Sequence, residues 1–331
     1  MKNKSEIREL FDRLGRMRAL VIGDLMLDSY LWGEVERISP ESPVPVVDVK
    51  GEDHRPGGAG NVALNLRALG ADVSLLSLIG NDDTGRQLQN LLNKSDINTD
   101  FLVLSHERPS TRKTRILGRN QQMIRIDREA RQPITKELEE EVLIRYKKAL
   151  GEQRPDLILI QDYNKGLLTP AVIHALIDAA AEKNIFVAVD PKKENFLNYR
   201  GVNLFKPNLK ELNDSLGYDL NGREQEALRE VLGSLHRQMP HSYTLLTLSA
   251  EGVIYFDGSE MKHLAAHQRK VADVSGAGDT VISVAALAMA AGAPPLLAVE
   301  LANLAGGLVC EEVGVVPVMR ERLLTEILQL A

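Results

Sequence analysis

The sequence has one cysteine, few aromatic residues and no surplus of positive charge. The single cysteine, Cys310, excludes an internal disulfide bond and a cysteine-based zinc site. Aromatic residues make up 4% of the 331 residues, which is typical of a fold whose strands are built from Val, Ile and Leu. The net charge of −6 argues against general nucleic-acid binding, because binding to a phosphate backbone needs a concentrated basic surface.

The sequence also lacks an apolar run that predicts a membrane-spanning helix. Residues 281–310 are rich in apolar side chains, but AGAPP at 291–295 interrupts them, so neither half reaches the roughly 20 residues needed. We expect two packed helices joined by a turn there. The first 15 residues predict an amphipathic helix rather than a secretory signal, because no apolar region follows them. We therefore expect a cytoplasmic protein without a membrane partner.

Short continuous apolar runs recur along the chain, with helical patterns between them. Such runs are typical of strands that are buried on both faces, as in a parallel sheet. They span residues 19–24, 73–80, 157–162, 185–190, 202–208 and 243–249. The alternation of strands with helical segments such as 137–150 and 170–183 predicts an α/β fold, with a doubly wound, mostly parallel sheet flanked by helices. We expect residues 1–331 to form a single domain.

Two segments break this alternation. Residues 42–50 contain prolines that a central strand would not accept, so they predict an edge strand. Residues 112–129 predict a hairpin around LGRN at 117–120. We expect these segments to form a small β-sheet lid, made from about 31–50 and 100–128, over one edge of the main domain.

The lid segment concentrates positive charge. It carries Arg112, Lys113, Arg115, Arg119, Arg125 and Arg128. A further pair, in DPKK at 190–193, follows one of the predicted strands. A basic stripe on a flap suits an anionic small molecule, although a solvated surface would explain the charges equally well.

Polar residues end several of the predicted strands. They are Asp24, Asp162, Asp190 and Asn208. Because ligands of open parallel sheets bind beyond the carboxyl ends of the strands, we expect these residues to lie on the rim of a ligand site.

The motif ADVSGAGDT at 272–280 precedes a long apolar helical pattern. A helix that begins near Gly278 or Asp279 would present unpaired backbone N–H groups to an anion, and Gly276 and Gly278 would let the backbone approach it closely. Asp279 would then stand beside the anion as a general base for an attacking hydroxyl. The alternative is that Asp279 only caps the helix. The sequence has no G-x-x-x-x-G-K-[ST] motif, so phosphate chemistry would need another cradle.

RPGGAGN at 55–61 predicts a second close approach of the backbone to a ligand. Gly57 and Gly58 leave room for that approach, and Asn61 could bond a ligand hydroxyl or simply cap a helix. A dinucleotide fingerprint is disfavoured, because the spacing is G-G-x-G and no acidic strand end follows about 20 residues later.

KPNLKEL at 206–212 places Asn208 and Glu211 three residues apart, on one face of a helix that starts at Asn208. They could orient the water shell of a Mg²⁺ ion, form a capping box, or do both.

Together these motifs resemble the ribokinase-like (PfkB) sugar kinases over nearly the whole chain. The matching strings are GD at 23–24, GGAGN at 57–61, N-x-x-E at 208–211 and DVSGAGDT at 273–280. The resemblance implies that Asp279 is the catalytic base and that Gly276, Ala277, Gly278 and Asp279 form the anion hole with their backbone. It places Asp24, Gly57, Gly58 and Asn61 on the sugar, and ATP with Mg²⁺ near Asn208 and Glu211.

The same resemblance implies further ATP contacts from Thr247, Ser249, Gly252, Gly278 and Asn303. TLSAEG at 247–252 departs from the usual T-x-G-x-x-G of the family, because Ser249 replaces a glycine. The lid corresponds to the β-sheet lid of the family, which implies a homodimer formed through it.

Narrower features resemble one branch, the D-glycero-β-D-manno-heptose 7-phosphate kinases. They lie at 37–47, 113–115, 125–129, 161–166 and 278–282. This branch implies transfer from ATP to the anomeric O1 of the heptose 7-phosphate, with Arg125 and Lys193 on the substrate. The fused nucleotidyltransferase that carries H-x-G-H in many bacteria is expected elsewhere, because that motif is absent.

Two alternatives remain open at this point. One is a kinase of another sugar phosphate, such as fructose 6-phosphate. The other is a non-catalytic sugar-phosphate sensor on the same fold. An intact Asp279 argues against the sensor, because a pure binding protein needs no base there.

Overall fold

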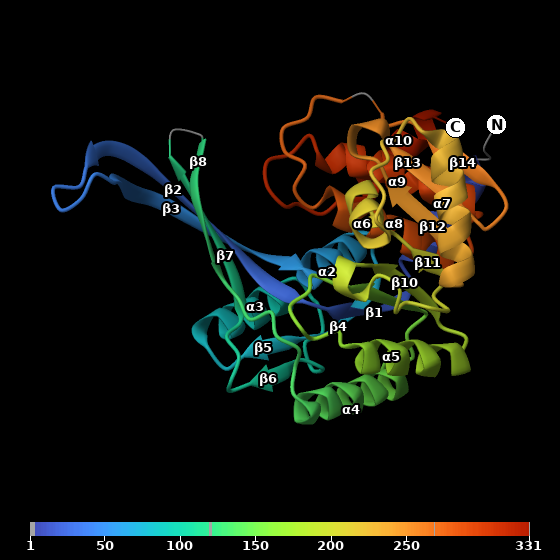
Figure 1. Cartoon of the computed structure of the whole chain (residues 1–331), viewed down its shortest axis with the longest axis horizontal. Coiled ribbons are helices and arrows are strands. Elements are labelled where there is room, and N and C mark those ends of the chain that lie inside the picture. The colour runs from blue at the N-terminus through green and yellow to red at the C-terminus, as the bar shows by residue number, and fades with distance from the viewer. Residues whose placement is uncertain (1–3, 119–120, 268, 331) are drawn as a thin grey trace.

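The computed structural model describes residues 4–118, 121–267 and 269–330, which are arranged around an eight-stranded sheet (Figure 1). The strand order is β14-β13-β12-β11-β10-β9-β1-β4. The strands are β1 (Arg18–Gly23), β4 (Asp72–Leu76), β9 (Leu157–Gln161), β10 (Phe186–Asp190), β11 (Leu204–Phe205), β12 (Tyr243–Thr247), β13 (Val253–Phe256) and β14 (Met261–Leu264). All pair in parallel except β13 and β14, which form an antiparallel edge. This sheet confirms the predicted fold class.

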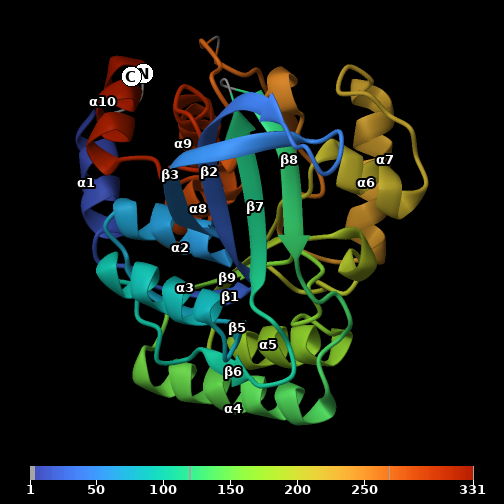
Figure 2. The same ribbon diagram turned by 90° about the vertical axis from the view of Figure 1, so that its left-hand side faces the viewer.

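Helices cover both faces of the sheet (Figure 2). One core contains side chains from α1 (Lys4–Leu14), α2 (Ala59–Ala68), α3 (Asp83–Lys94), α8 (Ala277–Ala290), α9 (Pro295–Val309) and α10 (Arg320–Leu330). The other contains side chains from α4 (Lys136–Glu152), α5 (Pro170–Glu182), α6 (Leu209–Leu216) and α7 (Gln225–Gln238). In β1, Val21 packs in the first core while Leu20 and Ile22 pack in the second. Burial on both faces explains why the strands are continuous apolar runs.

The apolar stretch 281–310 forms two helices, α8 and α9, as predicted. They pack against each other, and α8 is buried over most of its length. Over residues 4–118, 121–267 and 269–330, no helix has both the length and the apolar character needed to span a membrane.

A second sheet of four strands projects from the body as the lid (Figure 1). Its strands, in spatial order, are β3 (Pro45–Gly58), β2 (Leu25–Ile38), β7 (Thr111–Gly118) and β8 (Gln121–Arg128). The segment with prolines lies in the edge strand β3, as expected. The β7–β8 hairpin also forms as predicted, but the predicted turn residue Arg119 and its neighbour Asn120 lie outside the described residues.

The lid bounds differ from the predicted 31–50 and 100–128. β2 begins directly after Asp24, and its first six residues are buried because they still belong to the body. Residues 100–110 do not enter the lid, since β6 (Val103–Ser105) pairs with β5 (Leu78–Gly80) in a separate two-stranded sheet.

The apolar run 73–80 is likewise two strands rather than one. The chain leaves the main sheet at Ser77, whose hydroxyl donates to the carbonyl of Gly23 (2.6 Å) and accepts from the N–H of Leu25 (3.2 Å). The Ser77 hydroxyl therefore bonds the backbone groups of Gly23 and Leu25 that a continued β4 strand could have paired with. The next strand, β5, leaves the main sheet.

Candidate active site

The helix α8 begins at Ala277, one residue before the predicted start. Gly276 is its N-cap, with a φ of 79° in the left-handed region that favours glycine. Asp279 therefore does not cap the helix. The N–H groups of Gly278 and Asp279 donate no hydrogen bond to any described residue. Because the helix dipole adds to these free donors, this end of α8 can hold an anion.

The Asp279 carboxylate is held by three donors from other parts of the chain. Asn61 Nδ2 donates to Oδ2 (2.7 Å). Gln161 Nε2 and Tyr163 Oη both donate to Oδ1 (3.1 Å each). Each carboxylate oxygen can accept about two hydrogen bonds, so the remaining capacity is on Oδ2. The carboxylate is thereby fixed in orientation, with Oδ2 open to one more donor such as a substrate hydroxyl.

The pKa of Asp279 is raised to about 6. Burial is the main cause, and the negative charge of Asp190 adds to it, while Asn61, Lys206 and Tyr163 act in the opposite direction. A carboxylate with a pKa just below neutral is largely deprotonated at pH 7 and still able to take up a proton. This is the property that a general base needs.

Removing the hydroxyl of Tyr163 should shift the pH dependence of any reaction that uses Asp279. The Tyr163 hydrogen bond lowers the pKa of Asp279. In Tyr163→Phe we therefore expect the acid limb of kcat/KM to move to higher pH, with about a tenfold loss at pH 6, since a hydrogen bond to a charged group contributes roughly 1.5–3 kcal/mol. Measuring kcat/KM from pH 5 to 9 checks this. Superimposable profiles would mean that Tyr163 does not act on the base.

The GGAGN loop lies against Asp24. α2 begins at Ala59, and its N–H donates to the carbonyl of Asp24 (3.0 Å). Gly58 has a φ of 58°, and a Cβ there would lie 2.4 Å from the same carbonyl oxygen. Asn61 is inside the helix and does not cap it. Instead it contacts Asp279, which brings two motifs 218 residues apart into one site.

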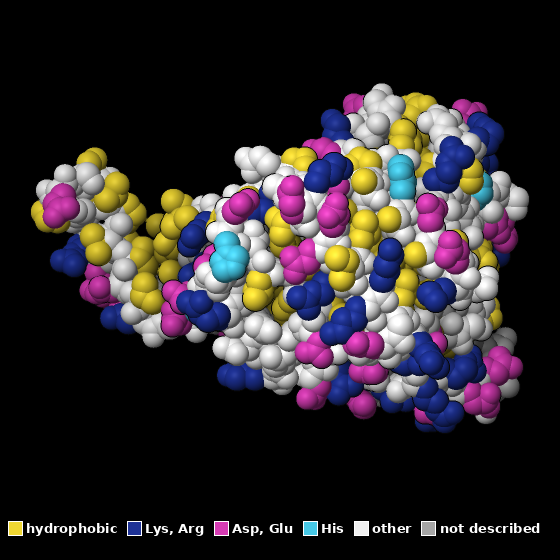
Figure 3. Space-filling view, turned by 90° about the horizontal axis from the view of Figure 1, so that it is seen from below, with side chains coloured by type: hydrophobic (Ala, Val, Ile, Leu, Met, Phe, Trp, Pro, Cys, Tyr) yellow, Lys and Arg dark blue, Asp and Glu magenta, His cyan; other side chains and the backbone are white. Residues whose placement is uncertain are grey.

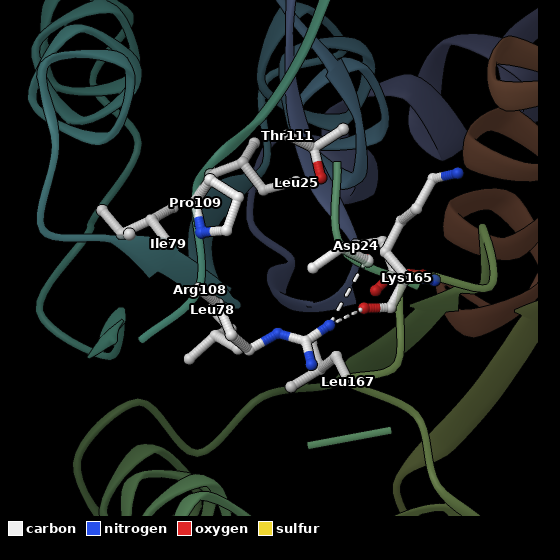
Figure 4. Close-up of a pocket in the computed structure, with 11 residues that line it drawn as sticks. Asp24, Leu25, Leu78, Ile79, Arg108, Pro109, Thr111, Lys165 and Leu167 are labelled. Carbon is white, nitrogen blue, oxygen red and sulfur yellow. Dashed lines mark hydrogen bonds between the residues drawn. The ribbon is translucent and has the colours of Figure 1, made fainter. Parts of the chain in front are cut away.

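Asp24 is buried and anchors the segment that carries Tyr163. Its Oδ2 accepts from the N–H groups of Tyr163 (2.8 Å) and Lys165 (3.1 Å). Burial, followed by the charge of Asp162, raises the pKa of Asp24 to about 6. Figure 4 shows Asp24 in a small pocket with Arg108, which donates to the carbonyl of Lys165 (2.8 Å) and also to that of Gln132 (2.7 Å). The root of the β7–β8 hairpin is thereby tied to the same segment.

Asn208 and Glu211 form the predicted capping box at the start of α6. Asn208 Oδ1 accepts from the Glu211 N–H (2.8 Å), and Glu211 Oε2 accepts from the Asn208 N–H (2.9 Å). Lys192 also pairs with Glu211. Since both oxygens already have partners, the residues fit Mg²⁺ contacted through its water shell better than direct coordination. The described residues contain no cluster of three or more His, Cys, Asp or Glu side chains able to hold a metal.

The predicted ATP-binding residues Thr247, Ser249 and Gly252 lie around the end of β12. Thr247 forms an isolated parallel β-bridge with Asn208. Ser249 is exposed and has a φ of 54°. Gly252 has a φ of 93°, and a Cβ there would lie 2.1 Å from the carbonyl of Leu264, so this turn requires glycine. Asn303, on α9, donates to the carbonyl of Ala265 (2.8 Å). Gly252 and Asn303 thus shape the segment around β13 and β14.

The predicted substrate residues Arg125 and Lys193 are both at the surface. Arg125 is half exposed on β8, pairs with Asp127 (3.0 Å) and lies opposite Arg115. Lys193 is exposed at the start of a short 3₁₀ helix. Its neighbour Lys192 points inward instead, with its Nζ 5.2 Å from the centroid of the Tyr163 ring.

Sequence reasoning missed several residues of this network. Gln161 and Tyr163 flank the predicted rim residue Asp162, whose own side chain points away to Tyr199 Oη (2.7 Å) and Asn195 Nδ2 (3.1 Å). Alternation along an extended chain predicts that Gln161 and Tyr163 lie on the face opposite Asp162, but it does not place them beside Asp279. Lys113, from the lid, lies with its Nζ 5.5 Å from the centroid of the Tyr163 ring.

The sequence profile of the pfkB family carbohydrate kinases matches residues 17–322. This chain belongs to that family, which confirms the predicted class of phosphotransferase acting on a sugar hydroxyl. The bifunctional protein HldE of Pelobacter propionicus is 42% identical over 313 residues, covering 94% of this chain and 63% of that protein. HldE of Geobacter sulfurreducens is 41% identical over 312 residues, with the same coverage of 94% and 63%. The chain thus spans less than two thirds of the length of these relatives.

Two solved structures share the fold. Phosphofructokinase-2 from Escherichia coli, in complex with potassium, superposes with a TM-score of 0.79 at 18% identity and covers 95% of this chain and 99% of its own. Ribokinase from Arabidopsis thaliana, complexed with ribose and ATP, has a TM-score of 0.70 at 17% identity, covering 94% of this chain and 98% of its own. At this level of identity the similarity shows the fold alone.

Proposed function

We propose that this chain forms a single kinase domain that phosphorylates the anomeric O1 of D-glycero-D-manno-heptose 7-phosphate with ATP and Mg²⁺. The observation that carries the proposal is the buried Asp279 carboxylate beside the free N–H groups of α8. The heptose substrate is supported by the similarity to HldE proteins and by the lid strings that resemble the heptose 7-phosphate kinase branch.

In the proposed reaction the O1 hydroxyl donates to Oδ2 of Asp279, the oxygen with remaining acceptor capacity. Asp279 takes the proton as the oxygen bonds to the phosphoryl group. The N–H groups of Gly278 and Asp279 hold the phosphoryl oxygens. Asn208 and Glu211 would orient the water shell of a Mg²⁺ ion, which would supply positive charge to the ATP phosphates. The product is the 1,7-bisphosphate, and we propose a cytoplasmic location because the donor is ATP.

The 7-phosphate requires cations on the side of the lid that faces the site. Lys113 identifies that side, because its ammonium lies over the Tyr163 ring. Alternate residues of a strand share a face, so Arg115 and its cross-strand neighbour Arg125 lie on the same side. Arg115 is already paired with Asp28 (2.5 Å), whereas Arg125 is more exposed. We propose that Lys113 and Arg125 contact the 7-phosphate, with Lys193 approaching from the rim.

Turnover against a sugar panel tests this function. ATP consumption is measured with heptose 7-phosphate, fructose 6-phosphate and ribose, and the products are identified by mass. We expect selective turnover of the heptose. Turnover of another sugar instead would keep the kinase and overturn the substrate, and affinity without turnover on any sugar would favour the sensor.

We also propose that two copies associate through the lid. The face of the lid opposite Lys113 carries Leu31, Ile116, Ile124 and Ile126, which neighbour one another across β2, β7 and β8. Ile124 and Ile126 are 54% and 52% exposed. Figure 3 shows hydrophobic side chains along the projecting arm. An exposed apolar patch on a projecting sheet is typical of an interaction site, and the same sheet of a second copy is a matching apolar partner.

A charge in this patch should separate the copies. We expect the wild type to sediment as a dimer and Ile126→Lys to sediment as a monomer, because a lysine cannot be buried there without a partner. The control is Ile144→Lys, the same change at an exposed position on α4. Analytical ultracentrifugation over a range of concentrations measures both. A dimeric Ile126→Lys protein would contradict an interface on this face.

A further inference from the structure

Lys206 is a buried ammonium at the carboxyl edge of the sheet. Its side chain is 3% exposed, and its Nζ lies 3.0 Å from Asp190 Oδ2. Its backbone N–H donates to the carbonyl of Val189 (2.9 Å), which fixes it beside β10. A lysine is rarely buried unless it is paired, because removing the charge from water is costly. The ion pair with Asp190 reduces that cost, and an ammonium carries three N–H groups with which it can also bind a further anion.

The ammonium also lies at the start of α8. A Cβ built on Gly278 would lie 3.7 Å from Lys206 Nζ, the nearest described atom outside the neighbouring backbone of α8. Gly278 and Asp279 are the residues whose N–H groups lack an acceptor in the described part of the chain. The positive charge of Lys206 also lowers the pKa of Asp279. A cation, two free N–H groups and the proposed base therefore converge on one place.

The other charges of this region are arranged in pairs. Lys192 pairs with Glu211, and Lys206 pairs with Asp190. Asp279, by contrast, has no ion-pair partner within 4.0 Å among the described residues. An incoming phosphoryl group would bring more negative charge to the free N–H groups, next to Lys206. The Lys206 ammonium is placed to donate hydrogen bonds to the oxygens of that phosphoryl group.

We infer that Lys206 is a catalytic residue whose ammonium binds the transferring phosphoryl group at the start of α8. The inference rests on the proposed kinase function and adds a role to that site. As the bond from the sugar oxygen to phosphorus forms and the bond from phosphorus to ADP breaks, the proton passes to Asp279. Lys206 keeps its own protons and stabilises the phosphoryl oxygens throughout.

Removing the charge of Lys206 should slow the transfer. For Lys206→Met, which keeps a long unbranched side chain, we expect kcat to fall about one hundredfold, in the range for loss of one stabilising donor. A purely structural lysine would also lower activity, by leaving Asp190 buried without a partner. The double variant Lys206→Met/Asp190→Asn removes both charges of the pair. Under our proposal it stays slow, whereas recovery of wild-type kcat would overturn the proposal.

A binding measurement separates this inference from the identity of the sugar. The affinities of wild type and Lys206→Met for MgATP and MgADP are compared by calorimetry, without any sugar. If Lys206 contacts the phosphoryl group to be transferred, the variant loses about tenfold or more in affinity for MgATP and little for MgADP. An unchanged ratio of the two affinities would overturn the contact. Failure of every sugar in the panel would overturn the proposed function and leave this readout intact.

Discussion

Replacing Asp279 with Asn is expected to lower kcat by about three to four orders of magnitude, the upper part of the range for loss of a general base. Asn has nearly the same shape, so the packing at the start of α8 is preserved. Its amide is not basic and cannot accept the proton of the attacking hydroxyl. The affinity for ATP should change little, because the N–H groups of α8 remain in place. Single-turnover kinetics, together with calorimetry of ATP binding, separate the two effects.

The pH dependence provides a second readout of the same prediction. Asp279 acts in its deprotonated form and has a pKa of about 6, so kcat/KM of the wild type should rise with pH through about 6 and then level off. The residual activity of Asp279→Asn should lack this limb. Asp273→Asn is the matched control, since Asp273 lies in the same motif but caps local backbone, accepting from the N–H groups of Ser275 and Gly314 (2.9 Å each). Activity of Asp279→Asn within tenfold of wild type would assign the proton to another group.

The parts of the site that sequence could predict are those set by local chemistry. The glycines at 276 and 278, followed by an apolar run, predict a helix start with free N–H groups, and α8 begins there. Asn208 and Glu211 predict a capping box through their spacing alone, and it forms. The continuous apolar runs likewise predict buried parallel strands, because burial on both faces leaves that pattern in any sequence.

Features that depend on tertiary placement could not be predicted in the same way. Gln161 and Tyr163 contact Asp279 only because β9 lies between β1 and β10, which no local pattern specifies. Lys192 and Lys193 are adjacent and chemically alike, and the direction of the backbone decides that Lys192 points inward. The division of residues 73–80 into two strands depends on the hydrogen bond from the Ser77 hydroxyl to the carbonyl of Gly23 in β1, which is distant in sequence.

The network also explains why so many polar groups can be buried at this edge. Asp24, Asp190 and Asp279 each have a hydrogen-bond or ion-pair partner at or just after the end of a neighbouring strand. Buried charge is tolerated where such partners are fixed, and it is costly where they are missing. The raised pKa values of Asp24 and Asp279 show that the compensation is incomplete. That incompleteness is what leaves Asp279 able to accept a proton near neutral pH.

Gly276→Ala should cost two to three orders of magnitude in kcat, the range for loss of donors that stabilise a transferring group. The φ of 79° at this N-cap is unfavourable for alanine, and the added Cβ would lie 2.8 Å from Asn61 Nδ2 and 3.2 Å from Val315 Cγ1. The start of α8 must shift, or Asn61 must leave Asp279. The first change displaces the free N–H groups, and the second removes a donor that fixes the orientation of the Asp279 carboxylate.

Gly292→Ala separates the strain of the backbone from the damage to the site. Gly292 has a φ of 80° in the turn at the other end of α8, and a Cβ there would have no atom within 4 Å. Both variants carry the cost of about 1–2 kcal/mol for alanine in the left-handed region, so both should melt at lower temperature than the wild type. Only Gly276→Ala should lose activity. Equal kcat values in the two variants would mean that the position of the α8 N–H groups does not limit phosphoryl transfer, since the strain alone would then account for every effect.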